Sequence, residues 1–505
     1  MSIKFNRRNF LKALGLGIAS QAVSSCAAST QQIGDKPSKD KPESRINRET
    51  AEQSRLKVLF QRSIPIRHKV DVFIAGGGPS GVAAAIAATQ QGAKVFLIEG
   101  QSCFGGMGTS GLVPSFSKFS DGINFLAGGV GYQIYERCRD SGVFGPDYNP
   151  NRKYRWDSNP IHAEGLKRVY DSLITESGAG FTFQTRLIAV NAEGGYVQFA
   201  VCHGKSGLFA VKARIYVDCT GDGDLATWAG APFKKGDEQG NVQAGTLCSI
   251  WSGIDWKAVR AAGQYGKWPL GQDANLKQAI DDGIFTVKDP HLPGIWLNGR
   301  TQGGGNIGHT FGVDGTDERS ITEALLRGRK KVLEYERYYK EYNPGFENIE
   351  LAATGALLGI RETRRIIGDY VMTLEDYKNR ASFADEIGRY NNEVDIHASS
   401  PEPEEQEKVK KLFDSLHYKE GESYGIPYRA LTPRSLENVL VAGRCISTDR
   451  YVHGSLRVMP GCFITGQAAG AAAALAAAKQ TSTRGIDVKE LQQQLKKMGA
   501  FLPNA

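Results

Sequence analysis

A glycine-rich turn between a short apolar strand and an alanine-rich helix constrains this chain more than any other feature. Residues 70–75 form a β-rich apolar run that opens directly into GGGPSG at residues 76–81, and a helix is expected over 82–91. A second strand, residues 94–98, ends in Glu99. The order of strand, GxGxxG, helix, strand and acid predicts a βαβ unit that binds a dinucleotide.

Each part of this turn has a predicted role. Gly76 permits the tight turn, Gly78 lets the backbone approach a pyrophosphate, and Gly81 lets the helix pack closely on the strand. The N-terminus of the helix faces the phosphates, where its backbone N–H groups and its dipole favour negative charge. Glu99 is placed to accept hydrogen bonds from the ribose hydroxyls.

Later segments are expected to complete the site. Residues 213–226 form a strand that runs into the turn TGDGDLA, and residues 437–447 contain a buried strand that ends at AGRCIS. A helix is predicted over 462–479, with Pro460 in its first turn. Its small face would let it lie close to the sheet or a cofactor, and its N-terminal dipole could stabilise negative charge at the N1/C2-oxygen edge of a reduced flavin.

Together these motifs resemble the FAD-dependent oxidoreductase family, which has a glutathione-reductase-like FAD fold. The resemblance rests on GGGPSG, TGDGDLA, GxRETRRI, DIH and AGRCIS…GxxRVMP…GQAAG, from about residue 70 to about residue 479. It implies an enzyme with one bound FAD, and it places a glycine-rich loop at 105–106 beside the flavin. Near this loop no histidine or cysteine is well placed for covalent attachment, although Cys103 lies close in sequence, so we expect FAD to be bound non-covalently. The residues expected to hold FAD are Gly76, Gly78, Pro79, Ser80, Gly81, Glu99, Gly105, Gly106, Asp222, Gly443, Arg444 and Gly461.

The fold class predicted is α/β, with a split Rossmann-like FAD-binding domain and an inserted α+β substrate domain. The FAD-binding domain is expected in three parts, 67–111, 161–231 and 426–480. The remaining segments are expected to be a twin-arginine signal peptide (1–25), a flexible tether (26–66), a cap insertion (112–160), the substrate domain (232–425) and a C-terminal helix or tail (481–505).

The N-terminus has the pattern of a targeting signal. Arg7 and Arg8 precede a short apolar stretch, as in a bacterial twin-arginine export signal, and VSSC, ending at Cys26, resembles a lipobox. An ordinary signal cleaved near residues 27–28 is the alternative. We expect an exported protein, periplasmic or anchored in the outer membrane through a lipid on Cys26, and an exported protein has no pool of soluble nicotinamide cofactor.

The net charge supports no nucleic-acid partner. Of the formal +8, residues 1–25 carry +4 and residues 26–69 carry +5, which leaves the rest of the chain at about −1. The eight cysteines contain no CxxC pair, and the eight histidines contain no HxH or HExxH pattern. The sequence therefore predicts neither a metal site nor a disulfide framework.

Candidate substrate chemistry gathers in three later motifs. The segment RETRR places Arg361, Arg364 and Arg365 around Glu362, either as a clamp for an anionic or polar substrate or as an interdomain salt-bridge network. If the segment is helical, Arg361 shares a face with both other arginines. If it is extended, Arg361 shares a face with Arg365, and Arg364 points away.

Two histidines are candidates for the base that takes the substrate proton, because imidazole titrates near neutral pH. His453 comes first, since it shortly precedes the helix that is expected to face the flavin. His397 comes second, with Asp395 as the group that would orient it, although a lone histidine is more often structural. Arg457 could contact the pyrimidine edge of the flavin or a substrate oxyanion. The predicted catalytic residues are His453, His397, Arg457, Arg361 and Arg364.

The function expected is hydride transfer between a small polar substrate, such as a carbohydrate or a hydroxylated organic acid, and flavin N5. The electron acceptor could be oxygen, a quinone or a protein. Two alternatives stay open: a redox-neutral lyase or hydratase that uses FAD transiently, and a surface carbohydrate-binding lipoprotein with a vestigial flavin site. The intact glycine pattern and Glu99 argue against the last.

Overall fold

The computed structural model describes residues 58–149, 159–263, 273–290 and 294–505. The predicted export signal, Cys26 and nearly all of the predicted tether lie outside the described residues, so those expectations stay predictions. Residues from Phe60 to Ala505 form one compact unit.

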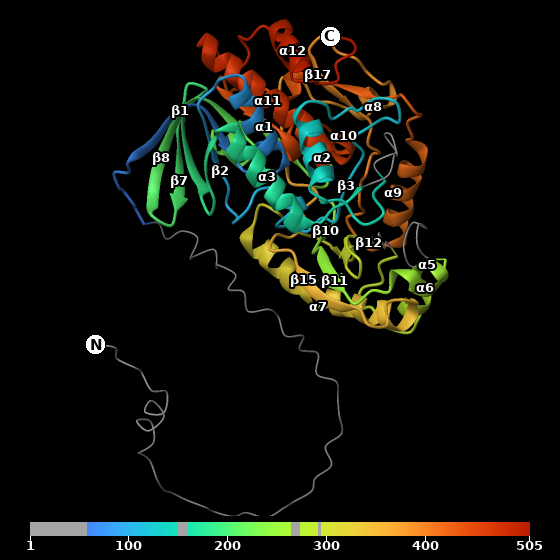
Figure 1. The fold of residues 1–505 in the computed structure, drawn as a ribbon. Coiled ribbons are helices and arrows are strands. Elements are labelled where there is room, and N and C mark those ends of the chain that lie inside the picture. Colours follow the sequence, from blue (N-terminus) through green and yellow to red (C-terminus); the bar gives the residue numbers. More distant parts are fainter. Residues whose placement is uncertain (1–57, 150–158, 264–272, 291–293) are drawn as a thin grey trace, which may run out of the picture. The chain divides into compact units, whose positions relative to one another are not determined.

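The βαβ unit lies at the centre of a mostly parallel sheet (Figure 1). Strand β1 (Ile66–Ala75) pairs in parallel with β2 (Val95–Ile98) on one side and with β8 (Gly207–Asp218) on the other. Beyond these, β2 pairs with β5 (Gly180–Thr182), and β8 pairs with β19 (Val439–Val441). The carboxyl ends of these parallel strands share one edge of the sheet, where α/β folds bind their ligands.

An antiparallel extension continues the sheet. Strand β7 (Tyr196–Gly204) pairs with the first half of β8, and β6 (Arg186–Glu193) pairs with β7. Only the second half of β8 is left to pair with β19, so β8 is the strand on which the early and late parts of the chain meet. The predicted α/β fold class, with a Rossmann-like region built from separate segments, is confirmed.

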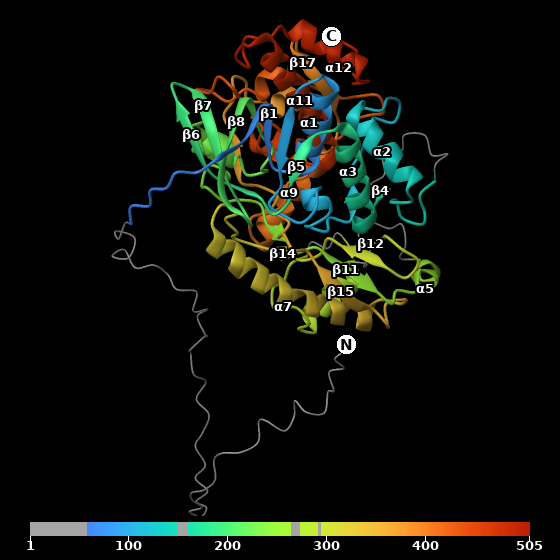
Figure 2. The same ribbon diagram turned by 60° about the vertical axis from the view of Figure 1, so that its left-hand side comes forward.

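Helices α1 (Pro79–Gln90) and α11 (Met459–Lys479) pack against each other with their backbones in close approach (Figure 2). A Cβ on Gly466 would lie 2.2 Å from the carbonyl oxygen of Ser80, and a Cβ on Gly470 would lie 2.2 Å from that of Ala84. Any larger residue at 466 or 470 would force the helices apart.

Helix α11 has the length and composition of a membrane-crossing helix, and it is the one such helix among the described residues. Its apolar length is almost entirely buried inside the protein. The alanines and glycines that give it this composition serve close packing against α1 and the sheet.

Two further helices pack beside α1. Helix α2 (Val130–Asp140) contacts α1, α3 (Ala163–Ser177) and α11, and it contributes Ile134 and Cys138 to the main hydrophobic core. Part of the segment predicted as a cap insertion therefore lies in the main core. The predicted segment boundaries themselves stay a prediction.

A second hydrophobic core lies within the segment predicted as the substrate domain. Its sheet has the order β12 (Ile295–Leu297), β13 (Gly303–Gly305), β11 (Ser249–Ser252) and β15 (Glu350–Thr354) among the described residues. Helix α7 (Glu318–Tyr342) supplies buried tyrosines to the same core, and Figure 1 shows it beside β11 and β15. The glycines of β13 are needed there because side chains of neighbouring strands and loops occupy the space that a Cβ would fill.

The remaining strands form two-stranded ladders, and the remaining helices are short. The ladders are β10 (Gly245–Thr246) with β14 (His309–Thr310), β16 (Arg364–Ile366) with β9 (Phe233–Lys235), β17 (Glu386–Tyr390) with β18 (Tyr424–Pro427), and β3 (Ser115–Phe116) with β4 (Asn159–Pro160). The helices are α4 (Asp224–Trp228), α5 (Trp256–Ala261), α6 (Asp273–Asp281), α8 (Leu374–Lys378), α9 (Pro403–Ser415), α10 (Arg450–Leu456) and α12 (Val488–Lys497), and the 3₁₀ turns are η2 (Gly106–Gly108), η3 (Tyr428–Ala430) and η4 (Gly443–Cys445).

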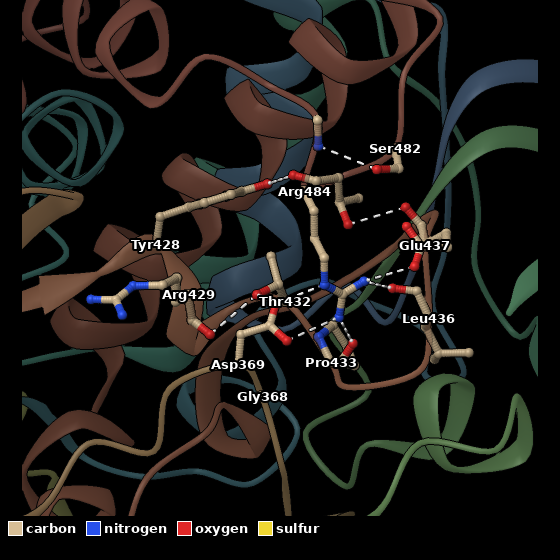
Figure 3. A network of polar contacts seen from close by, with 12 residues as sticks. Gly368, Asp369, Tyr428, Arg429, Thr432, Pro433, Leu436, Glu437, Ser482 and Arg484 are labelled. Carbon is tan, nitrogen blue, oxygen red and sulfur yellow. Dashed lines mark hydrogen bonds and ion pairs between the residues drawn. The ribbon is translucent and has the colours of Figure 1, made fainter.

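Arg484 ties the segment after α11 to the loop before β19 (Figure 3). Its Nε donates to Asp369 Oδ2 at 2.8 Å, and its two Nη groups donate to the carbonyl oxygens of Leu436 and Pro433. The Glu437 carboxylate lies 3.5 Å from Nη1. One planar fork of donors thus joins three backbone segments, which a lysine cannot do.

Replacing Arg484 with lysine is expected to lower the free energy of unfolding by about 1–3 kcal/mol, because the two carbonyl groups lose their donor. Urea unfolding of the variant measures this loss. The exposed Arg434 in the same loop gives the matched control, Arg434→Lys, which should leave stability unchanged. Equal stability of the two variants would contradict the structural role of Arg484.

Candidate functional site

In the glycine turn after β1, neighbouring atoms fill the space beside Gly76 and Gly81, whereas the space beside Gly78 is open. Gly76 has a φ of +98°, and its Cβ would lie 2.4 Å from the carbonyl oxygen of Cys219. A Cβ on Gly81 would lie 1.8 Å from the carbonyl oxygen of Gly76. Among the described residues nothing lies within 4 Å of a Cβ built on Gly78. The backbone at Gly78, at the N-terminus of α1, therefore faces space that a phosphate group can fill.

Glu99 binds the turn itself. Its Oε2 accepts a hydrogen bond from the backbone N–H of Gly77 at 2.7 Å, and its Oε1 accepts one from Gln101 at 2.7 Å. Burial raises the pKa of this carboxyl, and the backbone donors partly oppose that shift. Each oxygen keeps lone-pair capacity, so the predicted bond to ribose hydroxyls remains chemically available.

The loop at Gly105 and Gly106 lies between the turn and α11. The N–H of Gly105 donates to the carbonyl oxygen of Gly77 at 2.8 Å. A Cβ on Gly106 would lie 3.4 Å from Gly78 Cα, and one on Gly108 would lie 2.7 Å from the Met459 sulfur. The structure thus brings this loop, the turn and the start of α11 together.

The late glycines lie at the same place. The N–H of Gly443 donates to Thr465 Oγ1 at 3.1 Å, and its Cβ would lie 2.6 Å from Ser80 Oγ. A Cβ on Gly461 would lie 2.5 Å from the carbonyl oxygen of Leu456, so Gly461 closes the tight step from α10 into α11.

Asp222 has protein partners. Its Oδ1 accepts hydrogen bonds from Arg444 Nη2 and from Thr363 Oγ1, both at 2.7 Å. The pair links the TGDGDLA turn to the segment after β19. A direct contact of Asp222 or Arg444 with the cofactor stays a prediction.

Asp218, which the sequence reasoning did not single out, organises the TGDGDLA turn. Its Oδ1 accepts from the backbone and side chain of Thr220, and its Oδ2 accepts from the N–H of Ala226 at 2.8 Å. Burial raises the pKa of Asp218 to about 6. Its position as the last residue of β8, directly before the turn, was the signal available in the sequence.

The RETRR segment is extended at its end, where Arg364 and Arg365 begin β16. Arg364 pairs with Asp224 at 2.7 Å, while Arg365 pairs with Glu362, which also lies 3.3 Å from Arg450 Nε. For Arg364 and Arg365 these contacts match the salt-bridge alternative, and Arg364 does point away from Arg365.

Arg361 differs from its two neighbours. It is only 6% exposed, and its Nη1 donates to neutral oxygens, the Ala244 carbonyl at 2.7 Å and Thr246 Oγ1 at 2.9 Å. Burial lowers the pKa of Arg361 to about 10, and the nearby Arg457 cation adds to the shift. Among the described residues no carboxylate lies within ion-pair distance of it, so this buried cation is suited to an anionic substrate group.

His397 lies in a row of buried titratable groups. Its Nδ1 lies 2.8 Å from His309 Nε2, and its Nε2 lies 3.3 Å from Asp395 Oδ1. On the far side, His309 Nδ1 lies 3.0 Å from Asp289 Oδ2. Burial holds the pKa of His397 well below its usual value, and the Arg361 cation acts in the same direction.

Asp395 connects this row to the start of α11. Its Oδ2 and its carbonyl oxygen accept hydrogen bonds from Arg457 Nη2 at 3.0 and 2.8 Å, and Arg457 follows the last residue of α10, two residues before α11 begins. The Asp395 side chain is 42% exposed, whereas that of His397 is 8% exposed. Burial alone would raise the pKa of Asp395, but His397, Arg457 and Arg361 hold that pKa far below the usual range. Asp395 is therefore the accessible, ionised end of the row.

His453 is placed differently from His397. It is 2% exposed, and burial together with Arg457, Arg365 and Arg444 holds its pKa well below the usual value. In the described part of the chain neither ring nitrogen has a hydrogen-bond partner of good geometry, although the backbone of Arg444 lies near the ring.

Buried polar atoms without partners surround the start of α11. Within the described ranges they include Arg444 Nη1, Arg457 Nε and both ring nitrogens of His453. Such groups are costly unless a bound molecule satisfies them. Together with the open space at Gly78, they fit a dinucleotide whose phosphates lie at α1 and whose polar ring edge lies at α11.

His309 and Asp289 were missed by the sequence reasoning. They lie 88 and 108 residues before His397, and no motif spacing links them to it. A small pocket is lined by residues of both the predicted cap insertion and the predicted substrate domain, including Leu112 and Asn298. No group of three or more potential metal ligands occurs among the described residues.

Comparison with known proteins gives one extensive match. The sequence profile of a family described as FAD dependent oxidoreductase matches residues 71–495. No curated protein matches the chain.

Similar solved structures are distant. They include a geranylgeranyl bacteriochlorophyll reductase-like protein from Thermoplasma acidophilum (14% identity, 85% of this chain and 82% of that chain, TM-score 0.40). A p-nitrophenol 4-monooxygenase from Pseudomonas putida is 12% identical, over 85% of this chain and 84% of that chain, with a TM-score of 0.44. A myxobacterial chondrochloren halogenase is 11% identical, over 85% of this chain and 79% of that chain, with a TM-score of 0.39. Likenesses at this distance carry no argument about the reaction.

The open position at Gly78 gives a test of the cradle. Gly78→Val is expected to give colourless protein, because the side chain fills the space that a phosphate needs. The unfolding midpoint of this variant should equal that of flavin-stripped wild type, since the new Cβ meets no described atom. Gly81→Val, in contrast, should destabilise the flavin-free fold. A yellow Gly78→Val protein would contradict this placement of the phosphates.

Proposed function

We propose, from the premise that this chain belongs to the FAD-dependent oxidoreductase family, that it oxidises a small polar substrate, with hydride transfer to flavin N5. The observation that carries the proposal is the row that ends in Asp395 and His397 and is bonded to Arg457 beside the start of α11. Bound FAD supplies the two-electron acceptor. The protein's own residues bind the cofactor and the substrate and move the substrate proton.

The cofactor would be held by the N-termini of the two closely packed helices, α1 and α11. The turn at Gly76–Gly81 and the N-terminus of α1 would bind the pyrophosphate, with Glu99 on the ribose. The N-terminus of α11, together with the buried Arg457 Nε two residues before that helix, would stabilise negative charge on the flavin ring edge.

His397 is the better candidate for the proton acceptor. A base must hold the proton it takes, and the ionised Asp395 beside His397 favours the charged imidazole, against burial and the Arg361 cation. His453 faces three arginines, which disfavour a second positive charge there. His453 is better suited to a neutral hydrogen-bonding role beside the cofactor.

Arg361 supports a hydroxylated organic acid over a neutral carbohydrate as the substrate. Its buried cation contacts neutral oxygens, and its charge lies near Asp395 and His397. A substrate carboxylate on Arg361 would place a hydroxyl-bearing carbon of the same molecule within reach of the row.

Anaerobic reduction of the flavin by a panel of hydroxy acids and sugars tests this function. We expect a hydroxy acid to bleach the flavin, and His397→Gln to slow that reduction about 100-fold or more while FAD stays bound. His453→Gln should slow it less, and the exposed His203→Gln serves as the control.

Other outcomes of the same experiment identify the alternatives. Product formation without reduced flavin would favour a redox-neutral lyase or hydratase. A normal rate in His397→Gln with a slow rate in His453→Gln would reverse the assignment of the base. A colourless protein that cannot be reconstituted with FAD would favour a vestigial site.

Export with a lipid anchor is also part of the proposal, on the strength of Arg7, Arg8 and the lipobox-like Cys26. We expect Cys26→Ser to move the protein from the detergent phase to the aqueous phase after phase partitioning. Replacing both arginines with lysine should leave uncleaved precursor in the cytoplasm. Unchanged partitioning of Cys26→Ser would favour ordinary signal cleavage.

A further inference from the structure

Gln243 is a buried amide of which only one end is bonded. It is 2% exposed, and its Oε1 accepts a hydrogen bond from the backbone N–H of His397 at 3.0 Å. Its Nε2 is buried as well, and in the described part of the chain this nitrogen has no hydrogen-bond partner. A buried donor without an acceptor is costly, and an oxygen atom of a bound molecule would remove that cost.

The contacts of Gln243 allow one orientation of its amide. The backbone N–H of His397 can only donate, so it must face the amide oxygen. The reverse orientation would set two donors against each other. The backbone N–H of Gln243 in turn donates to Glu362 Oε2 at 3.2 Å. The backbone and the side-chain oxygen are therefore both held, and the NH₂ group is presented in a fixed position.

Arg361 presents a second donor beside this amide. Its Nη1 donates to the carbonyl oxygen of Ala244, the residue after Gln243, at 2.7 Å and to Thr246 Oγ1 at 2.9 Å. Its Nη2 makes a longer contact, 3.4 Å, with Asn306 Oδ1. The Nη2 group carries two N–H bonds and therefore keeps the capacity to donate to a further oxygen.

The balance of charge around Gln243 favours an anionic ligand. Glu362 is paired with Arg365 and lies 3.3 Å from Arg450 Nε, so its charge is compensated. In the ranges that the structure describes, Arg361 donates to neutral oxygens. A carboxylate would supply the missing negative charge, and its two oxygens can accept from Arg361 and from the Gln243 amide together. A ligand with hydroxyl groups alone would leave the buried cation without a counter-charge.

We propose that Gln243 is a specificity-determining residue, whose Nε2 donates to one carboxylate oxygen of the substrate while Arg361 binds the other. This inference rests on the proposed oxidation of a hydroxylated organic acid, and it names the pair that distinguishes the acid from neutral molecules of the same shape. Because Gln243 Oε1 is bonded to the backbone of His397, one amide links the bound carboxylate to the segment of the candidate base. An acid with its hydroxyl group close to its carboxylate fits this arrangement.

Binding of simple carboxylates to the oxidised holoenzyme tests the pair without turnover. The probes are acetate, propanoate and benzoate, each compared with its primary amide (acetamide, propanamide and benzamide), and flavin absorbance follows binding. A primary amide has nearly the shape of the carboxylate, but it carries no charge and offers one oxygen instead of two. We expect wild type to bind the best-fitting carboxylate about 100-fold more tightly than its amide. Equal binding of the two, or binding of neither, would overturn the proposal.

Gln243→Glu is the informative variant. Glutamate keeps an oxygen that accepts from the His397 N–H, but its second oxygen places negative charge beside Arg361 where the donor was. Carboxylate binding should weaken about 100-fold or more, while amide binding should hold, because the NH₂ group of the ligand can donate to the new carboxylate. The exposed Gln198→Glu is the matched control and should leave the preference for carboxylates unchanged.

A purely structural role of Gln243 would give a different pattern. Equal weakening of carboxylate and amide binding in Gln243→Glu would indicate a distorted site and overturn the proposal. Loss of FAD from the variant, with the preference for carboxylates retained on reconstitution, would assign the amide to the cofactor site and would also overturn it.

The pH dependence of the same dissociation constants gives a second readout. A protonated glutamate has an O–H donor where glutamine has an N–H donor, so carboxylate binding to Gln243→Glu should take up one proton. Relative to wild type, the dissociation constant of the variant should then rise about tenfold per pH unit across neutral pH. The charged and titratable groups that face this position, Arg361, Glu362 and His397, are the same in both proteins. A ratio of the two constants that does not change with pH would overturn the proposal.

The proposed function is judged by a separate result. If carboxylates bind through Gln243 but no hydroxy acid bleaches the flavin, this inference holds and the proposed oxidation fails. If a hydroxy acid bleaches the flavin with the same KM in wild type and in Gln243→Glu, the oxidation holds and this inference fails.

Discussion

The direct contact between the backbones of α1 and α11 is the constraint on which the candidate site depends. Gly466 and Gly470 lie against the carbonyl groups of Ser80 and Ala84, so α11 can neither rotate nor slide on α1 without a collision. This contact fixes the start of α11 relative to the glycine turn, although 378 residues separate Gly81 from Met459. The N-termini of α1 and α11 would then present two partial positive charges to the same bound FAD.

The local parts of the site could be predicted from the sequence because short spacings determine them. The GxGxxG turn, the strand before it and Glu99 at the end of the next strand follow from residue types within one βαβ unit. The row through His309 and His397 could not be predicted, since it exists only because β10 pairs with β14 while the two residues before β10 bond the loop of His397. No periodic pattern in the sequence indicates the contact between His309 and His397.

The arginines of RETRR show a different limit. Their density indicated a functional cluster, but their individual roles depend on the strand that begins at Arg364. Once β16 pairs with β9, Arg364 reaches the Asp224 carboxylate of another segment and Arg365 pairs with Glu362 of the same motif. Arg361, before the strand, is left among neutral oxygens. The charge that a substrate would meet is therefore set by tertiary structure, and sequence spacing alone left both alternatives open.

The pairing of β8 with both β1 and β19 has a consequence for synthesis on the ribosome. Until residues 439–441 emerge, the second half of β8 is an open sheet edge, and until α11 follows, the alanine-rich face of α1 has no cover. A nascent chain would carry this unpaired edge from the completion of β8 at residue 218 to the synthesis of β19 at residue 439, a state prone to pairing with other chains. Early protection of the growing polypeptide, by chaperones or by slow release, is thus a demand that the topology itself imposes.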